Sequence, residues 1–258
     1  MIALCRITSL PVTSAPCKKA ALTGSTDHTS WSVILFLFVI LLCVPVTVIA
    51  QTQLGADIDG EAAYDFSGWS VSLSSDGNRL AIGAPLNDGS NVPDSGHVRV
   101  YQWADSAWTQ LGADIDGEAA LDESGQSVTL SSDGNRLAIG AVKNDGNGFD
   151  SGHVRVYQWS GTAWMQLGAD IDGEVVYDES GRSISLSSDG NRLAIGANRN
   201  DGANGMDSVG HVRVYQWSGT AWTQLGADID GEATYDFSGW SVSLSSDGNR
   251  VAIGAPYN

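Results

Sequence analysis

Apolar and polar residues alternate along short segments after residue 50, and this alternation predicts the secondary structure. In residues 69–75 apolar residues alternate with serine, as in a strand with one buried face. An Asp-Gly pair at 76–77 follows, which is typical of a tight hairpin turn, and residues 79–84 form a second apolar segment. Residues 97–103 and 108–115 predict a third and a fourth strand. No segment after residue 50 has a sustained apolar period of 3.6 residues, so we expect no helix there.

The four-strand pattern recurs along the chain, and the recurrence predicts the fold. The aspartate of the motif SSDGNR lies at residues 76, 133, 189 and 247, so the copies are 57, 56 and 58 residues apart. Four strands in a repeat of this length are typical of a β-propeller blade. We therefore predict an all-β fold of propeller-type four-stranded blades, with about three full repeats plus partial blades in a truncated or open propeller. The predicted copies are approximately 53–109, 110–165, 166–223 and 224–258.

Tryptophan pairs flank the turn between the third and fourth predicted strands of each full copy. The pairs are Trp103 with Trp108, Trp159 with Trp164, and Trp217 with Trp222. We expect each pair to meet across two strands and to fill the interface between neighbouring blades, because stacked repeats bury one another's faces. Such pairs contribute about 0.5–1.5 kcal/mol beyond their buried area. The alternative is that these rings stack on sugars.

The N-terminal fifth of the chain has a different character. Residues 33–44 are an uninterrupted apolar run, preceded by Lys18 and Lys19 and followed by small residues at Val48 and Ala50. This pattern predicts that residues 1–50 are a secretory signal peptide or a signal anchor, with a hydrophobic helix. Either alternative places residues 51–258 outside the cytosol, secreted or at the cell surface, with the membrane contacted only through the N-terminal segment if it is uncleaved.

The charge of the chain argues against a nucleic-acid partner, and the positions of its cysteines argue against disulfides in the repeats. The chain has a formal net charge of −17 at pH 7. Residues 1–50 hold three bases and one acid, so residues 51–258 hold the other 29 acids against 10 bases. A domain this acidic repels phosphate backbones, so we expect no nucleic-acid partner. All three cysteines lie in residues 1–50, so no disulfide holds the repeats together.

The nonamer QLGADIDGE occurs four times and brings the densest set of acids. Four acids in and after each nonamer occupy positions 1, 3, 5 and 9, which are ligand positions in calcium loops, although the glycine is not where such loops need it. The alternative is a strand end followed by a turn, with the acids in solvent. The calcium hypothesis assigns as ligands Asp57, Asp59, Glu61, Asp65, Asp114, Asp116, Glu118, Asp122, Asp170, Asp172, Glu174, Asp178, Asp228, Asp230, Glu232 and Asp236.

The loop between the second and third predicted strands is the one segment whose length differs between copies. Variable length indicates a surface loop, and such loops carry binding residues. Its polar residues are candidates for partner binding or for a second metal site, although asparagine, aspartate and glycine also suit any turn. The candidates are Asn87, Asp88, Asp94, Asn144, Asp145, Asp150, Asn200, Asp201 and Asp207.

A histidine begins the third predicted strand of each full copy, at residues 97, 153 and 211. The repetition suggests a set of pH-sensitive groups, and the alternative is a structural hydrogen bond at the start of the strand. Catalysis is not expected, because every candidate Ser, His and Asp recurs identically, whereas an active site needs different residues in different roles. No nucleophile motif, zinc spacing or phosphate loop occurs.

The repeat resembles the FG-GAP repeat of integrin α-chain propellers and of many extracellular repeat proteins. The resemblance is carried by Phe66, Gly68, Ser70 and Val71, then by Gly83-Ala84-Pro85, and then by Val98, Val100 and Tyr101. It recurs in register through residues 51–258, although copies two and three have glutamate in place of the phenylalanine. The acid-rich calcium loop of integrin-like repeats has no counterpart here, because the connection between the first two strands is only SSDGNR. WD-repeat propellers are a second resemblance, but no Trp-Asp dipeptide closes a strand.

The resemblance implies a non-catalytic extracellular adhesion module. Its loops at one edge of the blades would recognise a protein or a glycan, and near-identical repeats would bind a repetitive ligand with avidity. The alternative is a structural repeat protein of a cell wall or matrix, with Ca²⁺ as a stabilising ion. No other cofactor is expected.

Overall fold

A computed structural model describes residues 4–5, 52–89, 92–202 and 207–258. The predicted signal peptide or anchor at residues 1–50 lies almost wholly outside the described residues. No helix in the part of the chain that the structure describes has the length and hydropathy of a membrane span. The chain divides into two units, and all strands from β2 to β19 lie in the unit that contains Gly55–Asn258.

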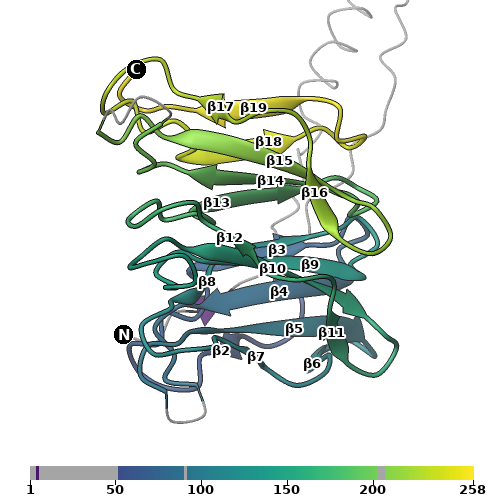
Figure 1. Cartoon of the computed structure of the whole chain (residues 1–258). Coiled ribbons are helices and arrows are strands. Elements are labelled where there is room, and N and C mark those ends of the chain that lie inside the picture. The colour runs from purple at the N-terminus through teal and green to yellow at the C-terminus, as the bar shows by residue number, and fades with distance from the viewer. Residues whose placement is uncertain (1–3, 6–51, 90–91, 203–206) are drawn as a thin grey trace, which may run out of the picture. The chain divides into compact units, whose positions relative to one another are not determined.

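The strands form repeated antiparallel sheets (Figure 1). Each five-stranded sheet has a path of four strands, and a fifth short strand pairs with the third strand of that path. The first sheet contains β3 (Ser70–Leu73), β4 (Arg79–Ala84), β5 (His97–Ala104), β6 (Ala107–Gln110) and β7 (Ile115–Asp116). The second contains β8 (Ser124–Leu130), β9 (Arg136–Ala141), β10 (His153–Trp159), β11 (Trp164–Gln166) and β12 (Ile171–Asp172). The third contains β13 (Ser183–Leu186), β14 (Arg192–Ala197), β15 (His211–Trp217), β16 (Trp222–Gln224) and β17 (Ile229–Asp230).

Two shorter sheets complete the described part. β18 (Ser241–Leu244) pairs with β19 (Val251–Gly254), and β1 (Leu4–Cys5) pairs with β2 (Ile58–Asp59). The predicted all-β fold is confirmed as a series of repeated antiparallel sheets of four or five strands. These sheets are consistent with propeller blades. The predicted absence of helices after residue 50 also holds over the residues described.

The Asp-Gly turn joins the first two strands of each sheet as predicted. Asp76 Oδ1 accepts hydrogen bonds from the Ser74 hydroxyl at 2.6 Å and from the Asn78 backbone N–H at 3.0 Å. Gly77 has a φ of 72°, which glycine adopts without steric cost. These bonds close the turn and fix the register of the hairpin.

The fourth predicted strand, 108–115, is broken in the structure. β6 ends at Gln110 and β7 begins at Ile115, and both pair with β5. Between them Gly112 has a φ of 87° and lies against Trp159 and Trp164 of the next sheet. The strand prediction was wrong over this segment because the positive φ of Gly112 is incompatible with a continuous strand, and Gly226 breaks the equivalent strand in the same way. The tryptophan pair itself packs between sheets as expected, with ring centroids 5.4 Å apart.

Each pair of consecutive five-stranded sheets encloses a hydrophobic core. Apolar residues from one face of each sheet pack against the next sheet, and both faces of the second strand are buried. Backbone groups also cross the junctions: Ser75, Ser132 and Ser188 each donate an N–H to the equivalent carbonyl of the next copy at 2.9 Å. The guanidinium of Arg136 donates to the Gly190 carbonyl of the next sheet at 2.9 Å. These contacts hold the repeats in a fixed order, with equivalent residues meeting at each junction.

Candidate functional site

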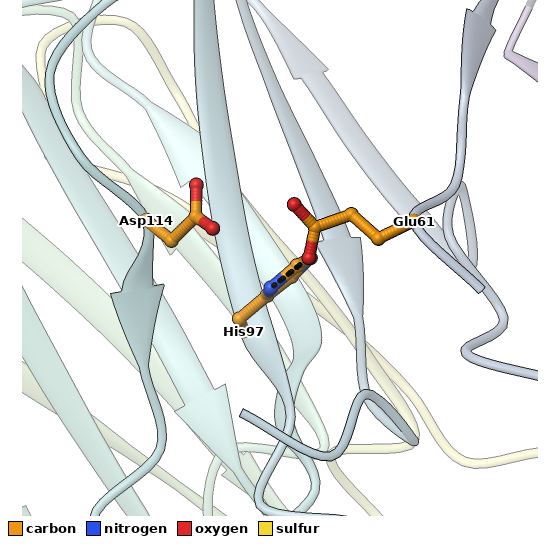
Figure 2. A group of neighbouring side chains, drawn as sticks. All are labelled: Glu61, His97 and Asp114. Atoms are coloured by element: carbon orange, nitrogen blue, oxygen red, sulfur yellow. Dashed lines mark ion pairs between the residues drawn. The ribbon is translucent and has the colours of Figure 1, made fainter. Parts of the chain in front are cut away.

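Three groups of side chains repeat at the junctions between copies, and each contains one histidine and two carboxylates. In each group the potential ligand atoms lie within 4.8 Å of one another. We call them seam groups: Glu61, His97 and Asp114; Glu118, His153 and Asp170; and Glu174, His211 and Asp228. Figure 2 shows the carboxylates of Glu61 and Asp114 on two sides of the His97 ring. Each of these groups could hold a metal ion.

Strand pairing brings the three members of a seam group together. His97 is the first residue of β5, and β7 pairs with the beginning of β5 so that His97 lies opposite Asp116. Asp114 lies in the break of the outer strand, one residue before β7, and therefore reaches the same place. Glu61 comes from the preceding nonamer, two residues after β2. Each seam group thus takes its glutamate from one nonamer and its aspartate from the next.

The glutamine at the start of each nonamer orients the aspartate of the group. Gln166 Nε2 donates to Asp170 Oδ1 at 2.5 Å. The other oxygen, Asp170 Oδ2, lies 3.9 Å from His153 Nδ1. Asp172 Oδ1 lies 4.0 Å from the same nitrogen, so the second seam group brings an additional carboxylate to the histidine.

A buried arginine two residues after each histidine positions the glutamate. Arg155 Nη2 donates to the carbonyl oxygen of Asp116 at 2.8 Å, and its Nη1 lies 3.5 Å from Glu118 Oε1. The other glutamate oxygen, Glu118 Oε2, lies 4.0 Å from His153 Nδ1. The glutamate is therefore shared between a fixed cation and the histidine. Arg99 and Arg213 make the equivalent contacts in the first and third groups.

Burial sets the charge of the histidines. Burial, and next the neighbouring Arg155 guanidinium, lower the pKa of His153 to about 4. The same two causes lower the pKa of His97 and of His211. The rings are therefore neutral near pH 7, which is the form that ligates metals. Burial raises the pKa of Glu118, because desolvation disfavours its charged form.

The fourth acid of each predicted calcium set lies elsewhere. Asp122 is buried, and its Oδ2 accepts hydrogen bonds from the Ala119 N–H at 2.9 Å and from Asn144 Nδ2 at 3.1 Å. Asn144, a candidate loop residue, therefore ties its own loop to this aspartate. Equivalent bonds join Asn87 to Asp65, Asn200 to Asp178, and Asn258 to Asp236. Among the described residues, no group of three or more potential ligands unites the four acids of a single copy.

The other predicted ligands lie around the seam groups or outside them. Asp116, Asp172 and Asp230 lie opposite the three histidines in the strand register. Asp57, Asp59 and Glu232 belong to none of the three groups found among the described residues. The calcium hypothesis for each separate nonamer stays a prediction, and the structure offers a different combination of the same acids.

The candidate acids of the variable loops close those loops. Asp145 Oδ1 accepts the backbone N–H of Asp150 at 2.9 Å, and Asp88 accepts that of Asp94 at 3.2 Å. Asp201 accepts the N–H of Ser208 at 3.0 Å, and it also lines a cavity of about 160 Å³ with the third seam group. The variable loop therefore reaches a seam group at the third junction.

A second repeated feature is a line of exposed apolar side chains on strained backbone. One position in the loop after each nonamer has a left-handed φ of 64° to 78° and carries a large side chain that is 54% to 73% exposed. We call these four residues the apolar edge: Tyr64, Leu121, Tyr177 and Tyr235. Non-glycine residues rarely adopt this backbone, and such strain persists where the surrounding structure enforces it. Leu121 and Tyr177 have other copies on both sides, so their exposure is a property of the loop itself.

In copies two to four, the variable loop of the preceding copy forms hydrogen bonds with this strained backbone. The N–H of Tyr177 donates to the Phe149 carbonyl at 2.8 Å, and that of Leu121 donates to the Pro93 carbonyl at 2.9 Å. The Tyr177 and Phe149 rings lie 5.5 Å apart in an edge-to-face arrangement. The Tyr235 hydroxyl donates to Asp207 Oδ2 at 2.9 Å. The candidate binding loops and the apolar edge therefore form one continuous surface.

Two sets of residues were absent from the predicted site. The repeated histidines were visible in the sequence, but their pairing with glutamate and aspartate depends on strand register. No side-chain hydrogen bond joins these histidines to another group among the described residues. The alternative interpretation had expected a structural hydrogen bond at the start of the strand. The apolar edge left no sequence signal, because Tyr and Leu are not residue types that predict a left-handed backbone.

Comparison with known proteins identifies the repeat. Residues 54–101 match the FG-GAP repeat family, which confirms the resemblance over the first copy. No curated protein matched the sequence. The solved structures that are similar include two of proteins provisionally named 6-phosphogluconolactonase. That from Bacteroides uniformis has 12% identity and a TM-score of 0.48, and that from Bacteroides fragilis has 11% and 0.46. Each likeness covers 71% of this chain, but the chain spans only 46% and 40% of theirs.

Proposed function

We propose that this chain, which carries an FG-GAP repeat at residues 54–101, is a non-catalytic extracellular module that binds a protein or a glycan. The observation that carries the proposal is the apolar edge. A left-handed backbone at a tyrosine or leucine costs about 1–3 kcal/mol, and it recurs here in all four copies. Glycine would take the same backbone without strain, so a large exposed side chain at this position favours a role in contact with a partner.

The chemistry of the edge suits a flat apolar partner surface or a sugar ring. Tyrosine combines an apolar ring face with a hydroxyl that hydrogen-bonds, and such residues are enriched where proteins bind partners. Equivalent side chains in consecutive copies are suited to a ligand that is itself repetitive, because each further contact becomes intramolecular. The acidic net charge of the repeats disfavours nucleic acid. Any contact with a membrane is assigned to residues 1–50.

The test separates binding from stability. The full chain is applied to a glycan array and to immobilised collagen, fibronectin and laminin, together with a variant that carries Tyr64→Gly, Tyr177→Gly and Tyr235→Gly. The triple variant is expected to keep or raise its melting temperature, because glycine relieves the strain, and to lose at least tenfold in affinity for any ligand found. The control is Met165→Ser on β11, where the side chain is 59% exposed but is not part of the apolar edge. Equal binding by the wild type and the triple variant contradicts the proposal.

The second candidate is a structural repeat protein of a cell wall or matrix, stabilised by calcium. It is favoured by the contacts that recur at the junctions: Arg79, Arg136 and Arg192 each bind the Asp-Gly-Asn turn of the following copy. The absence of binding both to the glycan array and to the immobilised matrix proteins favours this candidate. A melting temperature that is unchanged by millimolar calcium removes the calcium part of it.

A further inference from the structure

We infer that each seam group is a binding site for a first-row transition metal ion, Zn²⁺ in the first instance, held by one histidine, one glutamate and one or two aspartates. The inference does not depend on the proposed binding function. It differs from the calcium hypothesis both in the metal and in the ligands, because each site takes residues from two consecutive nonamers.

The first argument is the distance between the ligand atoms. In the second group, three carboxylate oxygens lie 3.9 to 4.0 Å from His153 Nδ1. These distances are too long for hydrogen bonds. A tetrahedral zinc ion with bonds of about 2.0 Å holds its ligand atoms about 3.3 Å apart, so small side-chain rotations would close the group around one ion. The exposed glutamate, at 45% exposure, is free to make that rotation.

The second argument is the unsatisfied histidine. The His153 side chain is 1% exposed, its Nδ1 points at carboxylates beyond hydrogen-bond distance, and its Nε2 is buried without a partner. His211 is in the same position. Buried polar atoms almost always have partners, and an exception calls for an explanation such as an ion. The unpartnered buried atom of the ring is Nε2, and it does not face the acids. His153 Nδ1 faces three carboxylate oxygens at 3.9 to 4.0 Å, beyond hydrogen-bond distance, and is the nitrogen at which a metal would bind.

The third argument is the charge of the surroundings. Around the neutral His153 lie Glu118, Asp170 and Asp172, against the single fixed cation Arg155. With these carboxylates ionised, the group carries an excess of two negative charges, which a divalent cation balances. Arg155 meets one oxygen of Glu118 and leaves the other oriented toward the histidine, so the arginine and the metal use different atoms of the same carboxylate.

The donor set selects the metal. Calcium takes six to eight oxygen ligands, whereas imidazole nitrogen with a few carboxylates suits zinc and its neighbours in the first transition row. The ion would join the preceding nonamer, through its glutamate, to the strand pair that carries the histidine and aspartate. Bound metal would therefore tie consecutive copies together at the junction.

The experiment measures metal stoichiometry in the full chain. The chain is dialysed against a chelator and then titrated by calorimetry with ZnCl₂ and, separately, with CaCl₂. The expected result is saturable binding of three Zn²⁺ per chain, with Ca²⁺ at least a hundredfold weaker. Fewer than one Zn²⁺ per chain, or Ca²⁺ binding as tight as Zn²⁺, overturns the inference.

The chain supplies its own matched control. Glu174→Gln changes a ligand of the third group, whereas Glu232→Gln changes the equivalent residue of the fourth nonamer, which belongs to none of the groups. The first variant is expected to bind two Zn²⁺ and the second to keep three. Both glutamates are exposed, so neither variant should disturb folding, which far-UV circular dichroism checks. Equal stoichiometry in the two variants overturns the assignment.

A spectroscopic readout identifies the histidine. Co²⁺ in place of Zn²⁺ should give the visible absorption of a nitrogen–oxygen site, and His211→Gln should remove about a third of that absorption. An unchanged spectrum in a folded His211→Gln chain overturns histidine ligation.

Discussion

The close approach of consecutive sheets predicts a large cost for adding one methyl group at Gly140. A Cβ built at this residue lies 2.3 Å from the Gly181 carbonyl oxygen of the next sheet and 2.4 Å from Ser127 Oγ. The Gly140 backbone is extended, so alanine is conformationally acceptable and the cost comes from contact alone. The carbonyl must retreat by about 1 Å to reach van der Waals distance, and overpacking of this kind costs about 1–3 kcal/mol.

Two further effects set the net magnitude for Gly140→Ala. The Ser127 hydroxyl donates to the same carbonyl at 2.7 Å, and loss of that hydrogen bond adds about 1 kcal/mol. Alanine has less conformational freedom than glycine in the unfolded chain, which stabilises the folded state by about 0.7 kcal/mol. Because backbone must move, we take the upper end of the overpacking range and expect a net loss of about 3 kcal/mol, which is about 10 °C in melting temperature for a chain of this size.

The matched control for this prediction is Gly254→Ala. Gly254 is the equivalent residue of the fourth copy, and its added Cβ would meet closely only the Ser241 hydroxyl, a side chain that can rotate. Urea unfolding followed by tryptophan fluorescence measures both variants against the wild type. We expect Gly254→Ala to lie within about 1 kcal/mol of the wild type. Equal destabilisation by the two substitutions would refute the reasoning, because the cost would then come from the strand and not from the junction.

Other substitutions test the junctions and turns. Arg136→Met removes the hydrogen bonds to Gly190 and Asn191 of the next sheet and should cost about 2 kcal/mol in urea unfolding, whereas Arg250→Met, with no following sheet among the described residues, should cost much less. Gly168→Ala places a Cβ 2.9 Å from a tryptophan ring and should cost about 1–2 kcal/mol more than Gly226→Ala, where nothing lies within 4 Å. A serine hydroxyl and then a backbone N–H lower the pKa of Asp189, so its charge stabilises the fold above pH 3.8 and ceases to do so as the pH falls through the lowered value. Asp189→Asn should therefore be less stable than the wild type at pH 7, and the difference should shrink toward pH 2; a constant difference would contradict this.

The strands and hairpins could be predicted because their signals are local. The alternation in 69–75 and the Asp-Gly pair at 76–77 act within a few residues, and the hydrogen bonds of Asp76 confirm the turn they predict. The break at Gly112 could not be predicted in the same way. Gly112 takes a positive φ, as does the equivalent Gly226, and a glycine inside a strand pattern does not by itself show whether it continues or leaves the strand.

The ligand groups of the candidate site also could not be predicted from local sequence. The sequence identified acidic nonamers, and it grouped their acids by linear spacing within one copy. In the structure Glu61 and Asp114 belong to different nonamers and meet at His97 because β7 pairs with β5. The register between strands determines which acids are neighbours. Acids that repeat at a fixed spacing are compatible with more than one register, so the sequence alone does not show which acids meet. The left-handed backbone of Tyr177 was equally inaccessible, because tyrosine is not a residue type that predicts this conformation.

Identical repeats therefore acquire unequal roles through their neighbours. In the second nonamer, Asp114 faces His97, whereas the carbonyl of Asp116 and the side chain of Glu118 contact Arg155 of the second sheet. An internal nonamer takes part in two junctions, while the first and the fourth each contribute to one group among the described residues. Four nonamers consequently make three seam groups. In the second and third nonamers the aspartate and the glutamate therefore act at different junctions. The position of a repeat, and not its sequence, determines how many junctions it contributes to.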